Sequence, residues 1–173
     1  FNSEDNYGQI FCENDAFKIH INNVINLSLV NENLIKNNSF KIVVDGINSS
    51  GGVIIPKLLE LLGAEVIKIN CKPDGNFSHN PEPLDKNLSQ LKDAVLAEKA
   101  DLGIAVDPDV DRLVFVCDDG VLFGEEKFSC GDEFIPGLGV LRLDDPLKLD
   151  WVVDVLFCWL FLFLKTICIV FLL

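Results

Sequence analysis

Short runs of β-branched residues alternate with longer stretches of apolar residues at helical spacing in the middle of this chain. Residues 40–45 form the first strand pattern, and residues 53–62 form a helical pattern after a turn of small residues. Residues 65–69 give a second strand pattern, and Gly63 ends the helix before it. This order predicts a right-handed crossover unit whose two strands lie parallel in one sheet.

A loop, a second helix and three further strands follow. Residues 70–83 contain three prolines and a glycine, which mark a loop, and residues 84–99 have a helical pattern. The strand patterns over residues 100–106 and 113–117 lie too close together for a crossover, so these strands must pair antiparallel. Residues 118–123 give a turn and a short returning strand. The sequence therefore predicts an α/β fold with a small mixed sheet flanked by helices.

Both ends of the chain differ from this middle part. Residues 1–39 are rich in Asn and acidic residues and contain one amphipathic stretch, residues 17–34, which we expect to be a connector helix from a preceding domain. The apolar positions of that stretch are Ile21, Val24, Ile25, Leu29 and Val30. We expect residues 40–127 to form the α/β domain and residues 128–173 to form a divergent hydrophobic tail.

The end of the tail, residues 151–173, is a dense apolar run interrupted by Asp154 and Lys165. Because a bilayer requires about 20 apolar residues, the run is long enough to span one. A charge near the middle of a bilayer costs roughly 3 kcal/mol on insertion scales, and no basic flank fixes an orientation, so the run is a poor span. Two interpretations stay open: sequence that is not native coding sequence, such as a frame change, and a membrane anchor.

Composition restricts the partners and the compartment. The formal net charge of −13 argues against a nucleic-acid partner, because phosphate backbones are neutralised by clustered Lys and Arg. The six cysteines show no C-x-x-C pairing and several lie in apolar runs, which predicts reduced, buried thiols in a cytoplasmic protein. The 173 residues contain no Met, so we expect a piece of a longer protein.

The alternating carboxylates Asp107, Asp109 and Asp111 stand between two strand patterns. Three carboxylates at alternate positions can converge on one cation where the chain turns tightly, and oxygen ligands favour Mg²⁺, Mn²⁺ or Ca²⁺ over zinc or copper. Arg112 adds a planar, permanently charged group that is suited to phosphate. The run therefore predicts a divalent-metal loop in phosphoryl chemistry.

Other interpretations of these residues are weaker. A solvated acidic turn is the alternative without metal. An EF-hand requires Gly at the sixth place of its loop, where Arg112 stands, and its interior would be the apolar residues 113–117. Residues 49–52 could hold a phosphate at a helix N-terminus, but they lack the Lys-Ser/Thr ending of a P-loop, so a tight turn is favoured.

Four motifs in a fixed order resemble the second domain of the α-D-phosphohexomutases, the phosphoglucomutase and phosphomannomutase enzymes. The motifs are Ile42-Val43-Val44-Asp45-Gly46 with residues 49–52, Pro73-Asp74-Gly75-Asn76-Phe77 with His79-Asn80-Pro81-Glu82-Pro83, residues 103–112, and residues 120–126. The resemblance covers residues 40–127. The metal loop of most bacterial-type members reads D-G-D-x-D-R, and here Pro108 stands in the place of Gly, which removes one backbone donor.

The resemblance implies a part of a four-domain enzyme that moves phosphate between the C1 and C6 oxygens of a hexose phosphate through an enzyme phosphoserine. It implies Mg²⁺ as the cofactor, with Asp107, Asp109 and Asp111 as its ligands and Arg112 as the phosphate contact. It leaves open whether glucose or mannose phosphate is the substrate.

The phosphoserine loop of the first domain and the sugar-binding loops of the later domains are not recognisable in this chain. Residues 78–81 copy the family's S-H-N-P sequence, but their neighbours fit a second-domain loop, so Ser78 is expected to be no nucleophile and His79 to be a hydrogen-bonding residue. Residues 124–126 are expected to be a turn and a helix start and not a sugar-binding loop. The chain is therefore expected to contain no catalytic residue and to be inactive alone.

Two functions follow from the sequence. The first is a phosphohexomutase fragment that supplies the Mg²⁺ loop and acts on a hexose phosphate only within the full enzyme. The alternative is a non-catalytic metal-binding or interaction module that residues 151–173 anchor to a membrane.

Overall fold

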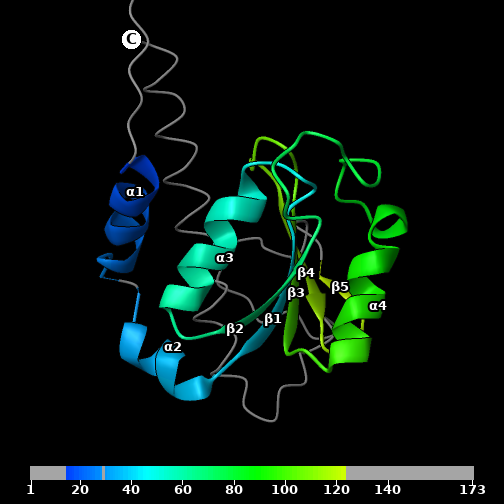
Figure 1. The fold of residues 1–173 in the computed structure, drawn as a ribbon. Helices are drawn as coiled ribbons and strands as arrows, with labels where there is room; N and C mark the ends of the chain where they lie inside the picture. Colours follow the sequence, from blue (N-terminus) through cyan, green and yellow to red (C-terminus); the bar gives the residue numbers. More distant parts are fainter. Residues whose placement is uncertain (1–14, 29, 124–173) are drawn as a thin grey trace, which may run out of the picture.

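A five-stranded sheet forms the centre of the computed structural model, which describes residues 15–28 and 30–123 (Figure 1). Its strands are β1 (Lys41–Asp45), β2 (Glu65–Ile69), β3 (Leu102–Val106), β4 (Leu113–Cys117) and β5 (Leu122–Phe123). The spatial order is β2-β1-β3-β4-β5, in which β1 runs parallel to β2 and β3 whereas β4 runs antiparallel to β3 and β5. The predicted small mixed α/β sheet, with its parallel and antiparallel pairs, is confirmed.

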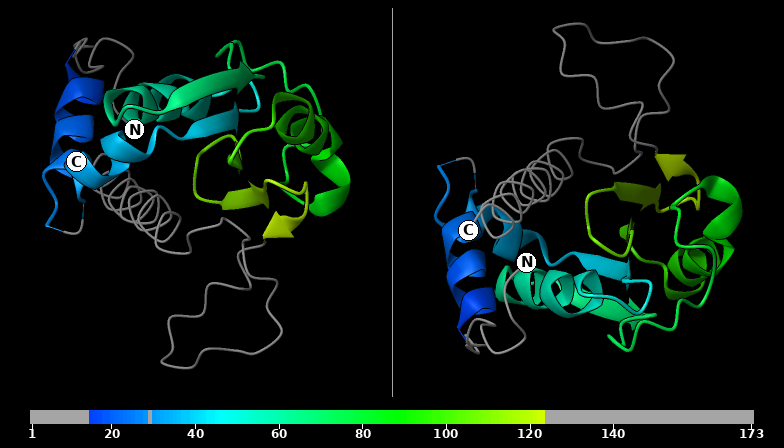
Figure 2. Two further views of the ribbon diagram at one scale, coloured as in Figure 1. Left: turned by 90° about the horizontal axis from the view of Figure 1, so that it is seen from below. Right: turned by 90° about the horizontal axis from the view of Figure 1, so that it is seen from above.

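Helices cover both faces of this sheet. Helix α3 (Gly51–Leu61) connects β1 to β2, and α4 (Ser89–Glu98) connects β2 back past β1 to β3. Because the two crossovers run in opposite directions along the sheet, right-handed connections carry their helices on opposite faces. Figure 2 shows α3 and α4 on the two sides of the sheet, with α1 (Ala16–Ile25) and α2 (Glu32–Asn38) on the α3 side.

Successive residues of the central strands enter two separate cores. Ile42 and Val44 of β1 pack with α1, α2 and α3, whereas Val43 between them packs with α4. Strands β3 and β4 are buried along their whole length, as expected for strands covered on both faces. This double burial fixes the ends of β1 and β3, where the loops of the candidate site begin.

The predicted helix over residues 17–34 is wrong in its extent, because the structure divides this stretch into α1 and α2. The side chain of Asn31 accepts a hydrogen bond from the backbone N–H of Leu34 at 3.1 Å and so caps a new helix. The predicted helix over residues 84–99 likewise begins with a 3₁₀ turn, Asp85–Asn87, before α4.

Within residues 15–28 and 30–123, no helix is both long enough and apolar enough to cross a membrane. The apolar run over residues 151–173 and the predicted turn at residues 124–126 lie outside the described part of the chain. The division of the chain at residues 39 and 127 stays a prediction.

Candidate metal centre

The six residues from Asp107 to Arg112 form the connection between β3 and β4. The last residue pair of the two strands is Val106 opposite Leu113, so the strands hold both ends of the connection close together. Inside it, the backbone N–H of Val110 donates to the carbonyl oxygen of Asp107 at 3.2 Å, which closes a tight turn. The sequence-predicted turn between two buried strands is therefore present.

Asp107 is the buried member of the acidic run, with 1% of its surface exposed. Its Oδ1 accepts hydrogen bonds from the backbone N–H of Asp111 at 3.0 Å and of Arg112 at 3.1 Å, and its Oδ2 accepts one from Nε of Arg112 at 3.0 Å. Burial and the neighbouring Asp111 carboxyl raise the pKa of Asp107, although the backbone and side chain of Arg112 act in the opposite direction. Three donors thus fix the direction of this side chain.

Asp109 and Asp111 complete the acidic run and are exposed. One carboxylate oxygen from each of Asp107, Asp109 and Asp111 can be chosen so that all three atoms lie within 4.8 Å of one another. The turn between them passes through Val110, whose φ is +61° and whose side chain is fully buried. A β-branched residue rarely adopts this left-handed conformation, so the surrounding contacts must hold the turn in place.

The donor set suits a hard divalent cation. All three side chains offer carboxylate oxygens, and their convergence on one point from an exposed loop leaves room for the water ligands that Mg²⁺ retains. Three negative charges at this separation repel one another, and a cation between them would relieve that repulsion. These residues therefore fit the metal that the family resemblance implies.

Arg112 lies between the acidic loop and the long loop over residues 70–83. Its Nε donates to Asp107, and its Nη1 donates to Oε1 of Glu82 at 3.2 Å. The carboxylate of Asp107, and to a smaller extent that of Glu82, raises the pKa of this guanidinium. The sequence did not single out Glu82 as a site residue; its position between two prolines, Pro81 and Pro83, is the only local signal of a fixed backbone there.

A buried carboxylate at the end of β1, Asp45, fastens the same long loop. It accepts hydrogen bonds from the backbone N–H of Ile47 at 3.0 Å and from Nδ2 of Asn70 at 3.1 Å. Nε2 of His79 lies 3.0 Å from Oδ2 of Asp45, and Nδ1 of His79 lies 2.8 Å from the carbonyl oxygen of Asn80. His79 is thus a hydrogen-bonding loop residue, as predicted.

The interpretation of Ser78 as an ordinary loop residue stays a prediction. Ser78 is exposed, and both ring nitrogens of the adjacent His79 contact oxygens of other residues, Asp45 and Asn80. Neither nitrogen is therefore directed at the serine hydroxyl as the base of a nucleophilic serine would be.

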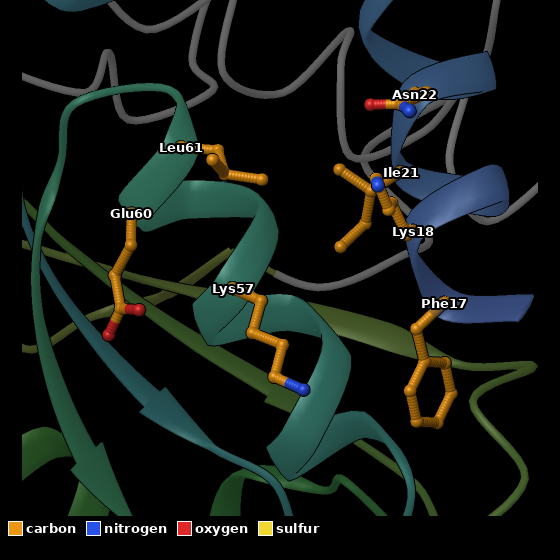
Figure 3. Close-up of a pocket in the computed structure, with 7 residues that line it drawn as sticks. All are labelled: Phe17, Lys18, Ile21, Asn22, Lys57, Glu60 and Leu61. Atoms are coloured by element: carbon orange, nitrogen blue, oxygen red, sulfur yellow. The ribbon is translucent and has the colours of Figure 1, made fainter. Parts of the chain in front are cut away.

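A separate hollow of about 480 Å³ lies between α1 and α3 (Figure 3). Its lining residues are Phe17, Lys18, Ile21, Asn22, Lys57, Glu60 and Leu61. The ammonium of Lys57 lies 5.6 Å from the centroid of the Phe17 ring, a cation–π contact across the hollow. None of these residues belongs to the acidic loop, so the hollow is not part of the candidate metal centre.

Residues 18–120 match the family described as phosphoglucomutase/phosphomannomutase, alpha/beta/alpha domain II. The match contains the acidic loop, Arg112 and the long loop over residues 70–83.

Several curated proteins are similar to this chain. A protein of Methanosarcina acetivorans described as a probable phosphoglucosamine mutase is 42% identical over 127 residues, which are 69% of this chain and 29% of that protein. A phosphomannomutase/phosphoglucomutase of Pseudomonas aeruginosa is 45% identical over 89 residues, which are 50% of this chain and 19% of that protein. The chain thus spans less than a third of the length of these relatives.

A solved structure from Thermus thermophilus, described as that of a phosphomannomutase, superimposes with a TM-score of 0.54 at 23% identity. The superposition covers 62% of this chain and 25% of the other. At this identity the likeness concerns the fold alone.

Proposed function

Because this chain belongs to the phosphoglucomutase/phosphomannomutase family and matches its alpha/beta/alpha domain II, we propose that its acidic loop supplies the metal site of a hexose-phosphate mutase. The observation that carries this proposal is the approach of the Asp107, Asp109 and Asp111 carboxylates to within 4.8 Å, on a loop held between two buried strands. We propose Mg²⁺ as the metal, because Mg²⁺ usually keeps several of its waters and binds through few carboxylates, whereas Ca²⁺ takes up to eight oxygen ligands.

The three carboxylates have different roles as metal ligands in this proposal. Asp107 is oriented by the backbone of its own loop, so it gives a fixed ligand, while the exposed Asp109 and Asp111 can adjust to the cation. Bound Mg²⁺ supplies neutralisation of negative charge on a phosphoryl group.

Arg112 contacts the same phosphoryl group in this proposal. Its Nε donates to Asp107 and its Nη1 donates to Glu82, which leaves Nη2 for a phosphate oxygen. Phosphoryl transfer depends mainly on positioning and electrostatic stabilisation, and both are within the reach of these residues.

The complete reaction that we propose moves a phosphoryl group between the C1 and C6 oxygens of a hexose phosphate through a phosphoserine. The names of the relatives add glucosamine phosphate to glucose and mannose phosphate as candidate substrates. No residue of this chain has the role of the phosphoserine in this proposal, so the chain alone should not turn over glucose-1-phosphate with a bisphosphate activator. Turnover that Ser78→Ala abolishes would contradict this assignment.

The metal site is tested by calorimetric melting of the full chain with and without Mn²⁺. A cation that binds only the folded state stabilises it by about 1.4 kcal/mol at a tenfold excess over its Kd, which raises the melting temperature by roughly 6–11 °C in a domain of this size. Asp109→Asn should reduce the rise, and it should leave the metal-free protein equally or slightly more stable because it relieves repulsion.

The matched control is Asp118→Asn, which removes the same charge from an exposed turn at the other end of β4. This variant should retain the full rise in melting temperature. A melting curve that is indifferent to Mn²⁺, or equal rises in wild type and Asp109→Asn, would remove the metal-site proposal.

A further inference from the structure

The turn between β1 and α3 makes a direct contact with the acidic loop. Oγ of Ser49 donates a hydrogen bond to the carbonyl oxygen of Pro108 at 2.5 Å. The neighbouring hydroxyl of Ser50 lies 3.5 Å from the same oxygen, at the limit of a hydrogen bond. Ser49 is half-buried and its own N–H closes the turn by donating to Gly46, whereas Ser50 is exposed. A residue 59 positions earlier in the chain therefore holds one peptide of the candidate metal centre.

Two of the three candidate ligands are joined to each other without this contact. The Asp107 carboxylate accepts a hydrogen bond from the backbone N–H of Asp111, so the backbone of the third residue is tied directly to the first carboxylate. Asp109 stands between them, next to Val110 with its strained φ of +61°. The position of Asp109 thus depends on how the middle of the turn is held.

The backbone of Pro108 can accept a hydrogen bond at its carbonyl but cannot donate one. Proline has no N–H, so Pro108 offers no donor. The peptide between Pro108 and Asp109 is planar, and a hydrogen bond to its carbonyl oxygen therefore also fixes the direction of the Asp109 N–H. The hydroxyl of Ser49 is the donor that makes this bond.

The first turn of α3 supports the loop from the same side. A Cβ added to Gly51 would lie 2.6 Å from Cγ2 of Val106 and 3.3 Å from Cγ2 of Val110. The absence of a side chain at Gly51 lets the turn approach the strained part of the loop closely enough for Ser49 to reach Pro108.

We propose that Ser49 is a positioning residue of the metal loop: its hydroxyl orients the Pro108–Asp109 peptide and so places the Asp109 carboxylate relative to Asp107 and Asp111. This inference rests on the proposed function of the loop. Ser49 touches neither metal nor substrate, and its effect on the metal passes through Pro108. The Ser49 hydroxyl already has a carbonyl oxygen as its acceptor. No phosphate bound in the turn over residues 49–52 is therefore needed to explain a serine at this position.

The test compares Mn²⁺ binding by the full 173-residue chain and three variants, measured by calorimetric titration at neutral pH and well below each melting temperature. Ser49→Ala removes the donor, Ser49→Thr retains a hydroxyl, and Ser50→Ala removes the neighbouring hydroxyl as a matched control. Ser49→Ala should bind Mn²⁺ about three- to tenfold more weakly, as expected for the loss of one net hydrogen bond. Ser49→Thr and Ser50→Ala should stay within about twofold of wild type, because both keep a hydroxyl donor at position 49.

The outcomes separate this inference from the proposed function. Wild-type affinity in Ser49→Ala, or an equal loss in Ser50→Ala, overturns the positioning role while the metal site stands. Failure of Ser49→Thr to restore binding also overturns it, since the hydroxyl would then not be the effective group. A wild-type chain that binds no Mn²⁺ overturns the proposed function and this inference with it.

Discussion

Replacing Asp45 with alanine should loosen the loop over residues 70–83 from the end of β1. The Asp45 side chain is 1% exposed and is the common acceptor for the N–H of Ile47 and the amide of Asn70, and it contacts the ring of His79. A cavity of a few methylene volumes is the smaller part of the change. The larger part is the loss of one acceptor that serves three groups.

The magnitude follows from what each group does after the substitution. A hydrogen bond to a charged group contributes about 1.5–3 kcal/mol. Asn70 also donates to Oε1 of Gln90 at 3.1 Å, and the His79 side chain is 18% exposed, so both can regain part of their hydrogen bonding. Ile47 is 1% exposed, so its N–H is left without water or protein acceptor. We expect a net loss of about 3–4 kcal/mol, which lowers the melting temperature by roughly 12–32 °C in a domain of about 100 residues.

A double-mutant cycle of Asp45→Ala and His79→Ala would test this reasoning, with the stability of each protein measured by thermal and urea unfolding. His79→Ala alone should cost about 1–2 kcal/mol, and it should cost clearly less in the Asp45→Ala background, where the contact with Asp45 is already gone and the contact with the Asn80 carbonyl is left to lose. Asp93→Ala on the exposed face of α4 is the control and should change stability by less than about 0.5 kcal/mol. An equal cost of His79→Ala in both backgrounds would refute the coupling.

Three further changes have expected outcomes. Gly103→Ala should destabilise the fold by about 1–3 kcal/mol in urea unfolding, because the new Cβ would lie 2.7 Å from Cγ2 of Val95 and 3.0 Å from Cβ of Val116. Adding Val95→Ala should recover part of the lost stability. A Gly103→Ala variant as stable as wild type would contradict the close packing of α4 on β3. Burial raises the pKa of the Cys71 thiol to about 11, so its alkylation at mildly alkaline pH should be slower in the folded than in the urea-unfolded chain. Peptide mapping would measure the two rates, and equal rates would contradict the burial of this thiol. Deleting residues 128–173 should leave a cooperative melt, and its loss would show that these residues belong to the core.

The sequence predicted the sheet well because its strands are marked locally. Residues 65–69 are a short run rich in β-branched residues and residues 113–117 are a short apolar run, and their expected bounds agree with β2 and β4. The spacing between strands then decided which pairs are parallel and which antiparallel. The carboxylates of the acidic loop were equally visible, because all three lie within five consecutive residues and the chain need only turn to bring them together.

Contacts between distant segments were not predictable in the same way. Glu82 contacts Arg112, which is 30 positions away in the sequence, and Asp45 contacts His79, which is 34 positions away. No local period or spacing indicates such a partner, because it depends on which loops the sheet order brings to one edge. The break between α1 and α2 was missed for a different reason: the Asn31 cap competes with an apolar pattern that continues across it.

The proline within the acidic loop also bears on the conformational entropy of the chain. Its ring fixes one backbone dihedral of Pro108 and restricts Asp107 before it to extended conformations, in the unfolded state as in the folded one. Fewer conformations are therefore lost when this turn forms. This smaller loss of conformational entropy concerns the residues that carry the carboxylates. A cation bound at the proposed site would meet a loop that is already largely ordered, so its affinity would be set by charge and by the removal of its water ligands more than by the ordering of the protein.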